Sequence, residues 1–269
     1  MKSVLSIVVF VFLGLSPAAS RAALETRPVE YRDGDTTLIG YVALDPAKLR
    51  ANAAGVAPGV LIIHQWMGPT DYEKGRAHQL ADLGYVAFVA DIYGKDLRPK
   101  DRGEAAVAAG KFKTDRALFR KRLQLGFDQL RGHPKVDPAR TAAIGYCFGG
   151  TGVLELARSG AAVSGVVSFH GGLDSPAPAD GKNIKARVLV LHGADDPFVP
   201  ADQIEAFKKE LNDAKVDWQM VYYSGAVHAF TQKLAGNDKS TGAAYEEKAD
   251  RRSWTAMRDF FDEVLPVEK

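Results

Sequence analysis

The stretch "IGYCFGGTG", residues 144–152, holds the only cysteine of the 269-residue chain. The apolar residues before it are typical of a strand, and "FGGTGVLELA" after it is typical of a helix. Cys147 therefore falls at a strand-to-helix turn, with Gly145 two residues before it and Gly149 two residues after it. Backbone segments crowd together at such a turn, so residues without a Cβ are needed there. The spacing G-x-C-x-G predicts a nucleophile elbow, which presents Cys147 at the N-terminus of a helix.

This stretch alone leaves three interpretations of Cys147 open. It could be a buried cysteine in a glycine-rich bend. The glycines could instead form a phosphate-binding loop, although neither G-x-G-x-x-G nor G-x-x-x-x-G-K-[ST] is present. The third interpretation is a reactive cysteine, because helix N–H groups and the helix dipole favour a thiolate. A lone cysteine cannot form an internal disulfide, but the cysteine count alone also allows an intermolecular link.

Strand-like apolar runs alternate with amphipathic helix-like segments along the chain. Several runs are continuously apolar, which is typical of strands buried on both faces of a parallel sheet. We predict one doubly wound α/β domain, with a mostly parallel sheet and helices on both faces. "RDGD" at 32–35 predicts a hairpin turn. The strand-like runs are 38–45, 60–65, 86–94, 141–147, 163–171, 187–193 and 218–225; the helix-face residues are Ile204, Phe207 and Leu211, and Trp254, Met257 and Phe261.

The N-terminus has the pattern of a signal peptide. Lys2 precedes a mostly apolar run at 4–15, and small residues follow in "SPAASRAALE". The alternative is a membrane anchor, but a span needs roughly 20 apolar residues, which this run does not reach. We predict a signal peptide at 1–22, cleaved after Ala22, and a mature domain at 23–269 in the bacterial periplasm or secreted.

The charge pattern argues against a nucleic-acid partner. The formal net charge is +2, with no strongly basic or acidic block. Arg116, Arg120, Lys121 and Arg122 cluster on a helix-like segment, where we expect a solvated face. No histidine or cysteine pair has zinc-site spacing, so we expect no metal.

The order of residues along the chain supplies partners for Cys147. In folds with this elbow the order is nucleophile, acid, then histidine. "RVLVLHGADDPFVP" places Asp195 and Asp196 directly after a strand-like run, and His228 is the only one of six histidines that follows them. We predict that Cys147, one of these aspartates and His228 form a catalytic set.

With these residues the chain resembles the dienelactone hydrolases, a family with the α/β-hydrolase fold. The resemblance implies that Asp196 is the acid, because the family's D-x-x-V-P falls at 196–200; Asp195 is the alternative. It also implies that the N–H groups of Trp66 and Phe148 form the oxyanion hole. The similar motifs are "HQWMG" (64–68), "DIYG" (91–94), "GYCFGG" (145–150), "HGADDPFVP" (192–200), "GAVHAF" (225–230) and "YEEKADRRSW" (245–254), and the resemblance covers about residues 27–266.

Three positions depart from the family pattern at expected substrate contacts. Gln65 stands where the family has a glutamate that contacts the resting thiol, and an amide cannot take up the proton. Gln232 and Lys95 stand where the family has arginines that hold a substrate carboxylate. Lysine still attracts a carboxylate, but it lacks the bidentate fork of arginine. An acidic lactone is therefore less strongly indicated than an ester or lactone in general.

The resemblance implies a carboxylic ester hydrolase of the carboxymethylenebutenolidase type. Cys147 would attack a small ester or lactone, His228 would transfer protons, and Asp196 would orient the imidazole. We expect no cofactor, no membrane contact after signal cleavage, and a monomer. The alternatives are a binding or thiol-sensing protein on a hydrolase scaffold, and a peptidase of the same fold.

Overall fold

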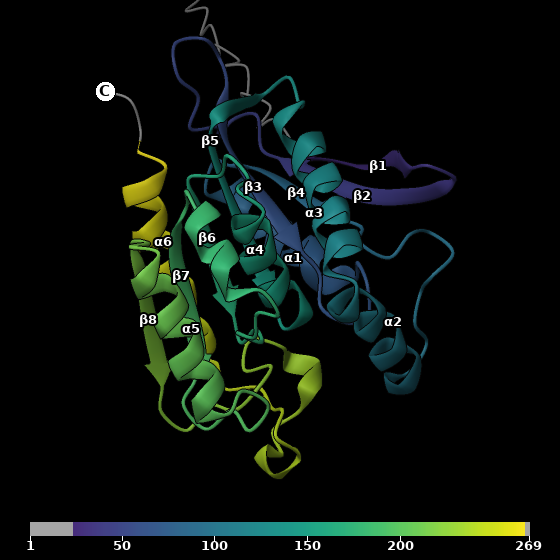
Figure 1. The fold of residues 1–269 in the computed structure, drawn as a ribbon. Coiled ribbons are helices and arrows are strands. Elements are labelled where there is room, and N and C mark those ends of the chain that lie inside the picture. Colours follow the sequence, from purple (N-terminus) through teal and green to yellow (C-terminus); the bar gives the residue numbers. More distant parts are fainter. Residues whose placement is uncertain (1–23, 267–269) are drawn as a thin grey trace, which may run out of the picture.

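An eight-stranded sheet runs through the molecule, in the strand order β1-β2-β4-β3-β5-β6-β7-β8 (Figure 1). The structure, a computed structural model, describes residues 24–266, and the predicted signal peptide lies outside them. β1–β2 and β2–β4 are antiparallel, and all other neighbouring strands are parallel. The predicted mostly parallel α/β sheet is confirmed. The strands are β1 (Glu25–Asp33), β2 (Thr36–Leu44), β3 (Ala57–Ile63), β4 (Val86–Ala90), β5 (Val136–Tyr146), β6 (Gly165–Phe169), β7 (Arg187–Gly193) and β8 (Trp218–Tyr223).

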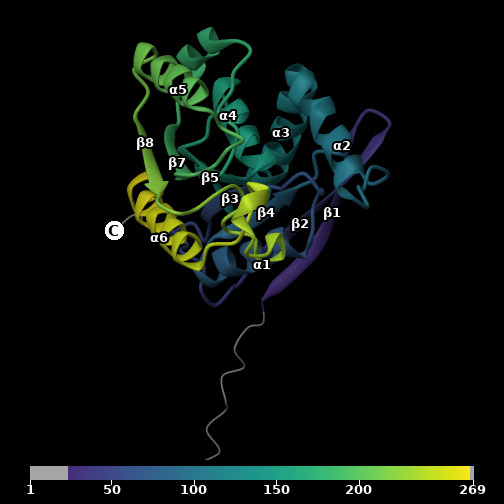
Figure 2. The same cartoon turned by 90° about the horizontal axis from the view of Figure 1, so that it is seen from below.

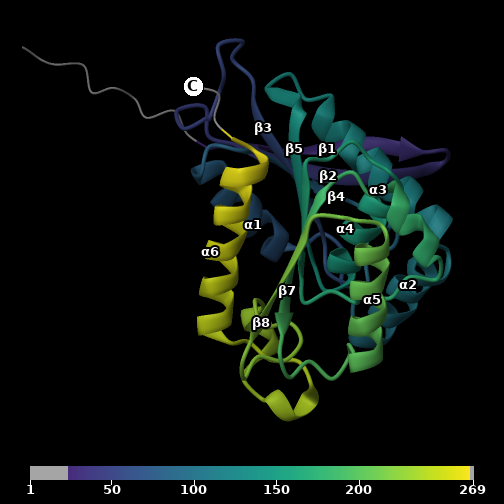
Figure 3. The same cartoon turned by 60° about the vertical axis from the view of Figure 1, so that its left-hand side comes forward.

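Helices cover both faces of this sheet. Figure 3 shows α1 and α6 on one face and α3, α4 and α5 on the other. No helix among residues 24–266 is long and apolar enough to cross a membrane. The α-helices are α1 (Asp71–Asp82), α2 (Arg102–Thr114), α3 (Arg116–Arg131), α4 (Phe148–Arg158), α5 (Ala201–Asp213) and α6 (Glu247–Val264); the short 3-10 helices are η1 (Pro178–Asn183), η2 (Lys233–Ala235) and η3 (Lys239–Thr241).

The apolar strand β3 shows why both faces must be covered. All of its residues are buried, and successive side chains of a strand point to opposite faces. Val60 and Ile62 pack in the core with residues of α1 and α6. Leu61 and Ile63 pack in the core with residues of α3, α4 and α5. A strand with a solvated face would expose half of these side chains.

The two predicted amphipathic helices are α5 and α6. Phe207 and Leu211 are buried on α5, and Met257 and Phe261 are buried on α6. Each set lies on one side of its helix and faces the sheet, as the i, i+3, i+7 spacing predicts. The predicted hairpin at 32–35 joins β1 to β2.

Three predicted strands are shorter in the structure, and the one predicted at 218–225 simply ends two residues early, as β8. The strand predicted at 86–94 stops at β4, because the carboxylate of Asp91 accepts the N–H of Tyr93 at 3.1 Å and turns the chain. The strand predicted at 163–171 is shorter at both ends in the structure, where it is β6. It ends before His170, whose φ of 40° is incompatible with a strand. Both turns lie where strands reach the carboxyl edge of the sheet.

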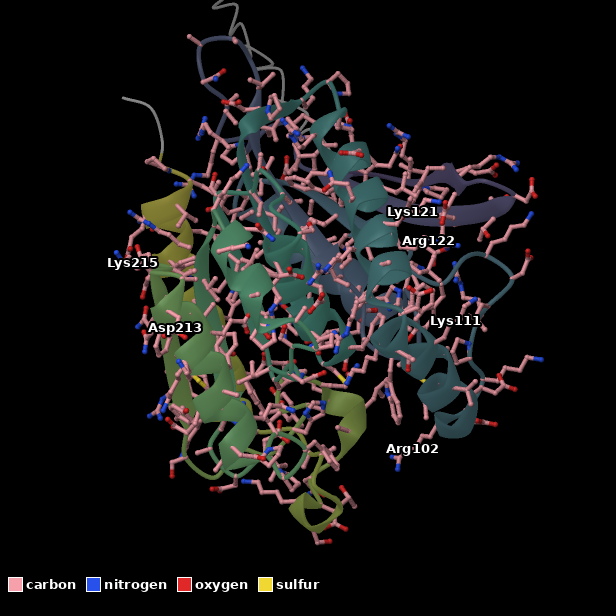
Figure 4. All side chains as sticks on the ribbon, viewed as in Figure 1. Arg102, Lys111, Lys121, Arg122, Asp213 and Lys215 are labelled. Carbon is pink, nitrogen blue, oxygen red and sulfur yellow. The ribbon has the colours of Figure 1, made fainter. Side chains whose placement is uncertain are left out.

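The basic cluster on α3 is paired with acids, and the predicted solvated face is wrong for most of it. Arg122 contacts Asp33 of β1 at 2.6 Å, and only 7% of its side chain is exposed. Arg120 contacts the fully buried Glu155 of α4 at 2.8 Å. Lys121 is 63% exposed but also pairs with Asp33. Figure 4 shows Lys121 and Arg122 between α3 and the β1–β2 hairpin. These ion pairs connect α3 to its neighbours.

The predicted sharp turn lies between β5 and α4. Cys147 adopts φ 55° and ψ −114°, outside the regions that residues with a Cβ usually adopt. A Cβ on Gly145 would overlap the carbonyl oxygen of Gly149. A Cβ on Gly149 would overlap the carbonyl oxygen of Ile63 in β3. Glycine is therefore required at both positions by the close approach of three backbone segments.

Replacing Gly145 with alanine should destabilise the protein. The new methyl group meets rigid backbone. We therefore expect the free energy of unfolding to fall by at least the ~1–3 kcal/mol that overpacking usually costs. Gly75→Ala is the matched control, because a Cβ there meets nothing within 4 Å and alanine stabilises a helix interior by about 0.5–1 kcal/mol. Urea unfolding of both variants measures the difference. Equal stability of Gly145→Ala and the wild type would contradict the assigned close approach.

Candidate active site

Three polar side chains meet at the carboxyl edge of the sheet, the end from which Figure 2 views the molecule. Cys147 precedes α4, Asp196 follows β7, and His228 follows β8. His228 Nε2 lies 3.1 Å from Cys147 Sγ. His228 Nδ1 lies 2.8 Å from Asp196 Oδ2. The fold thus brings together, within hydrogen-bond distance, Cys147, His228 and one of the two aspartates that chain order predicts.

The two candidate acids differ in their surroundings. Asp196 has a fully buried side chain, and its Oδ1 accepts the N–H of Phe198 at 2.9 Å. That bond leaves Oδ2 directed at His228. Asp195 is exposed and has no side-chain contact with His228. The geometry therefore favours Asp196, the residue that the family motif indicates.

Backbone contacts hold the loop that carries His228. Its N–H donates to the carbonyl of Gly242 at 3.1 Å, and its own carbonyl accepts the N–H of Ala244 at 3.0 Å. The Phe198 ring also meets the imidazole edge-on, with ring centroids 5.4 Å apart. The backbone contacts hold the loop in place, and the Phe198 ring packs against the imidazole itself.

The charges of Cys147 and His228 stabilise each other. Burial raises the pKa of the Cys147 thiol, but the charge and hydrogen bond of His228, with smaller contributions from Lys113 and the Phe148 N–H, together bring that pKa below its usual value. Burial lowers the pKa of His228, but the Cys147 sulfur and the Asp196 carboxylate raise it to about 10. Each charge therefore stabilises the other, which favours a thiolate–imidazolium pair over the neutral thiol and imidazole.

Lys113, which the sequence does not single out, is a further cation near the sulfur. It lies in the last turn of α2 and is exposed. Its Nζ is 3.7 Å from the position that a Cβ on Gly172 would occupy. Its charge contributes to the lowered pKa of Cys147. No motif marks this lysine, because it lies in a helix distant in sequence from Cys147.

The two N–H groups expected to form an oxyanion hole are held in place differently. The Phe148 N–H points at the sulfur and helps to lower the pKa of the thiol. The backbone around Trp66 is fixed on both sides: its carbonyl accepts the Tyr93 hydroxyl at 3.0 Å, and the preceding Gln65 N–H donates to Glu73 at 3.1 Å. Neither the Trp66 N–H nor the Phe148 N–H has a backbone acceptor among the described residues. The Trp66 N–H can therefore donate to a ligand, whereas the Phe148 N–H already faces the Cys147 sulfur.

The three residues predicted to contact the substrate, Gln65, Lys95 and Gln232, lie in surroundings that differ from one another. Gln65 is buried, and its side-chain amide forms no hydrogen bond to a described residue. Lys95 is exposed in the turn after β4. The Gln232 amide oxygen accepts the N–H of Leu234 at 3.3 Å and so caps η2. The structure gives neither Lys95 nor Gln232 a contact with the three central residues.

His170 is another residue at this edge that the sequence does not single out. Its Nδ1 lies 3.2 Å from the backbone nitrogen of Cys147, and its ring meets that of His228 edge-on at 5.3 Å. One sequence feature could have indicated that His170 lies near Cys147, namely its position directly after β6. β6 pairs with β5, and both strands end beside Cys147. Among residues 24–266, no group of three or more His, Cys, Asp or Glu side chains could hold a metal ion.

Comparison with known proteins agrees with this arrangement. A model of the dienelactone hydrolase family matches residues 45–265. The chain belongs to this family. The crystal structure of a dienelactone hydrolase-like promiscuous phosphotriesterase from metagenomic libraries is 41% identical, with a TM-score of 0.83 over 90% of this chain and 99% of that chain. The resemblance stated from the motifs and the α/β-hydrolase fold that it implies are both confirmed.

Curated relatives in this dienelactone hydrolase family are more distant. A putative carboxymethylenebutenolidase of Aquifex aeolicus is 27% identical over 250 residues, which is 88% of this chain and 98% of that protein. A probable 2-oxo-3-(5-oxofuran-2-ylidene)propanoate lactonase of Bradyrhizobium is 28% identical over 76% of this chain and 83% of that protein. This chain therefore spans most of the length of both relatives.

Removing the Lys113 charge should raise the pKa of Cys147. A thiolate loses stability when a nearby cation is removed, so the midpoint of the pH profile for iodoacetamide labelling should rise in Lys113→Gln, by about half a pH unit. The matched control is Lys111→Gln, because Lys111 lies on the same helix over the Phe112 ring and should not affect the midpoint. An unchanged midpoint in Lys113→Gln would show that this lysine does not act on the sulfur.

Proposed function

We propose that this protein hydrolyses small carboxylic esters or lactones through a thioester on Cys147. Membership of the dienelactone hydrolase family makes the protein a carboxylic ester hydrolase. The observation that carries the finer proposal is one unbroken chain of contacts. Asp196 contacts His228 at 2.8 Å, and His228 contacts the sulfur at 3.1 Å. A nucleophile, its proton carrier and an orienting acid at such distances are the parts that covalent hydrolysis requires.

In the first half of the reaction, the Cys147 thiolate attacks the substrate carbonyl carbon. The carbonyl electron pair moves to oxygen, and the N–H groups of Trp66 and Phe148 stabilise the resulting oxyanion. Removing one such donor usually lowers turnover by about 10²–10³-fold. The tetrahedral intermediate collapses, the C–O bond to the alkoxide breaks, and the imidazolium Nε2–H of His228 protonates that alkoxide. The acyl group remains as a thioester.

In the second half, neutral His228 takes a proton from water as the oxygen adds to the thioester carbon. The new tetrahedral intermediate expels the Cys147 thiolate and releases the carboxylic acid. The thiolate and imidazolium are thereby restored. Asp196 holds Nδ1–H throughout, so Nε2 always faces the reacting atoms.

The ordered acid also favours catalysis over thiol sensing. A sensing cysteine needs a low pKa and access to an oxidant, but it does not need a buried aspartate that fixes the histidine. Asp196 is buried and its second oxygen is bound by the Phe198 N–H. This degree of orientation supports proton transfer along a defined path.

A phosphotriester is a second candidate substrate. It is favoured by the 41% identity to the protein named a promiscuous phosphotriesterase, over 99% of that chain. The same sulfur would attack phosphorus instead of carbon. A substrate panel should therefore compare simple aryl esters, lactones, thioesters and one aryl phosphotriester. Cys147→Ala provides the background rate for each.

Turnover of the best ester in that panel tests the roles of the three residues. Cys147→Ala should show no activity above background, and His228→Ala should lose at least about 10³-fold. Asp196→Asn should lose about as much turnover as His228→Ala, or less. Asp195→Asn is the matched control and should stay within about twofold, because this side chain is exposed. If Asp195→Asn lost more activity than Asp196→Asn, the assignment of the acid would be wrong.

We also propose that the protein is exported and that the mature chain begins at Ala23. The charged and apolar pattern of the first 22 residues supports this. Expression of the full chain in a Gram-negative host, followed by intact-mass analysis of the periplasmic fraction, tests the proposal. A membrane-bound product that retains residues 1–22 would overturn it.

A further inference from the structure

We propose that His170 is a positioning residue that holds the Cys147 backbone and the loop of His228 together through the two nitrogens of one neutral imidazole. The inference rests on the proposed function only in taking Cys147 as the nucleophile. His170 is fully buried and takes no part in the chemical steps above.

The first contact is to the strained turn. The N–H of Cys147 is shared between the carbonyl of Phe169 at 3.0 Å and Nδ1 of His170 at 3.2 Å. A backbone N–H can only donate, so Nδ1 must be the unprotonated nitrogen. This acceptor supports the backbone that places Cys147 at φ 55°.

The second contact is to the loop that carries the base. Nε2 of His170 lies 2.8 Å from the hydroxyl of Thr231, three residues after His228. Because Nδ1 accepts, the neutral ring has its proton on Nε2 and donates it to this hydroxyl. The His170 ring also packs edge-on against His228 and Phe230, at centroid distances of 5.3 and 5.0 Å. One side chain thus connects the nucleophile to the loop of its proton carrier.

A buried network extends this connection to the helices. The Thr231 hydroxyl lies 2.7 Å from the Tyr72 hydroxyl of α1. Arg76 of α1 donates to the Thr231 carbonyl at 3.3 Å and contacts Asp250 of α6 at 2.6 Å. Thr231 is therefore anchored on both its hydroxyl and its carbonyl. His170 is held from the side away from Cys147 by groups that are themselves fixed.

The surroundings keep His170 neutral. Burial, followed by the positive charge of His228, lowers its pKa well below the usual value, and Arg76 and His192 act in the same direction. The nearby Tyr146 ring packs against it without a hydrogen bond. Protonation would remove the acceptor for Cys147 and place a second cation beside the imidazolium. The two neighbouring histidines thus have different protonation states and different roles.

Three variants separate the two contacts. His170→Ala removes both, Thr231→Val removes only the hydroxyl, and His170→Asn places an acceptor near the Nδ1 position in a residue that tolerates positive φ. A small misplacement of reacting groups can lower turnover by about 10²-fold. We expect that loss of kcat in His170→Ala, with KM little changed. His170→Asn and Thr231→Val should each lose less kcat than His170→Ala.

The pH profile of iodoacetamide labelling gives a second readout that needs no ester. If His170 aligns the sulfur with His228, the labelling midpoint of His170→Ala should rise toward that of an ordinary cysteine. His170→Asn should restore part of the shift. If the wild type labels with a low midpoint but hydrolyses no ester, the proposed function fails while the positioning role of His170 is still measured.

His192 is the matched control. It is also a buried histidine at the end of a strand, 2% exposed, and its buried Nδ1 has no hydrogen-bond partner within residues 24–266. His192→Asn should change stability, while kcat and the labelling midpoint should change much less than in His170→Ala, because no contact joins His192 to Cys147 or Thr231 among the described residues. The inference is overturned if the His170 and Thr231 variants also lose only stability, with kcat within twofold of the wild type and the labelling midpoint within about 0.3 pH unit of it, which is the same twofold change in the acid constant. If His170→Ala does not fold, His170→Asn and Thr231→Val decide by the same criterion.

Discussion

The close approach of three backbone segments at Gly145 and Gly149 is the constraint on which the site depends. With no Cβ at either position, the end of β5, the start of α4 and the end of β3 come into direct contact. Cys147 is then forced to a positive φ between β5 and α4. The same turn directs the N-terminus of α4, with the Phe148 N–H, at the sulfur.

The charge on that sulfur depends on its partners, because burial alone would oppose it. A buried ion pair is stable only when its geometry is good and its remaining hydrogen-bonding groups are satisfied. His228 meets this condition, since one nitrogen faces the sulfur and the other faces Asp196. The Phe148 N–H and Lys113 add to the stabilisation of the thiolate. Asp196 therefore acts on the sulfur through the imidazole, without touching it.

The sequence predicted the features that depend on local geometry and chain order. The glycine spacing predicted the turn at Cys147, and continuous apolar runs predicted the doubly covered sheet. Chain order selected His228, and the family motif distinguished Asp196 from Asp195. The sequence could not predict His170 or Lys113, because their roles arise from tertiary neighbours. A histidine after β6 contacts Cys147 only because β6 pairs with β5.

Two of the predicted substrate contacts, Gln232 and Lys95, lie in loops that are organised by local hydrogen bonds. Gln232 caps η2, and Lys95 lies in a turn that the carboxylate of Asp91 organises. The basic cluster on α3 fails as a prediction for a related reason. Its acidic partners, such as Asp33 and Glu155, come from β1 and α4 and cannot be paired with it from sequence spacing.

The central claim is that Cys147 and His228 form a thiolate–imidazolium pair before substrate binds. Because the chain has one cysteine, the ultraviolet absorbance of its thiolate can be titrated directly, as the difference between free and alkylated protein. We expect the thiolate signal to persist well below the pH of about 8.5 at which a free cysteine titrates. In His228→Gln it should appear only near or above that pH. A wild-type signal that appears only near pH ~8.5 would contradict the ion pair and the mechanism built on it.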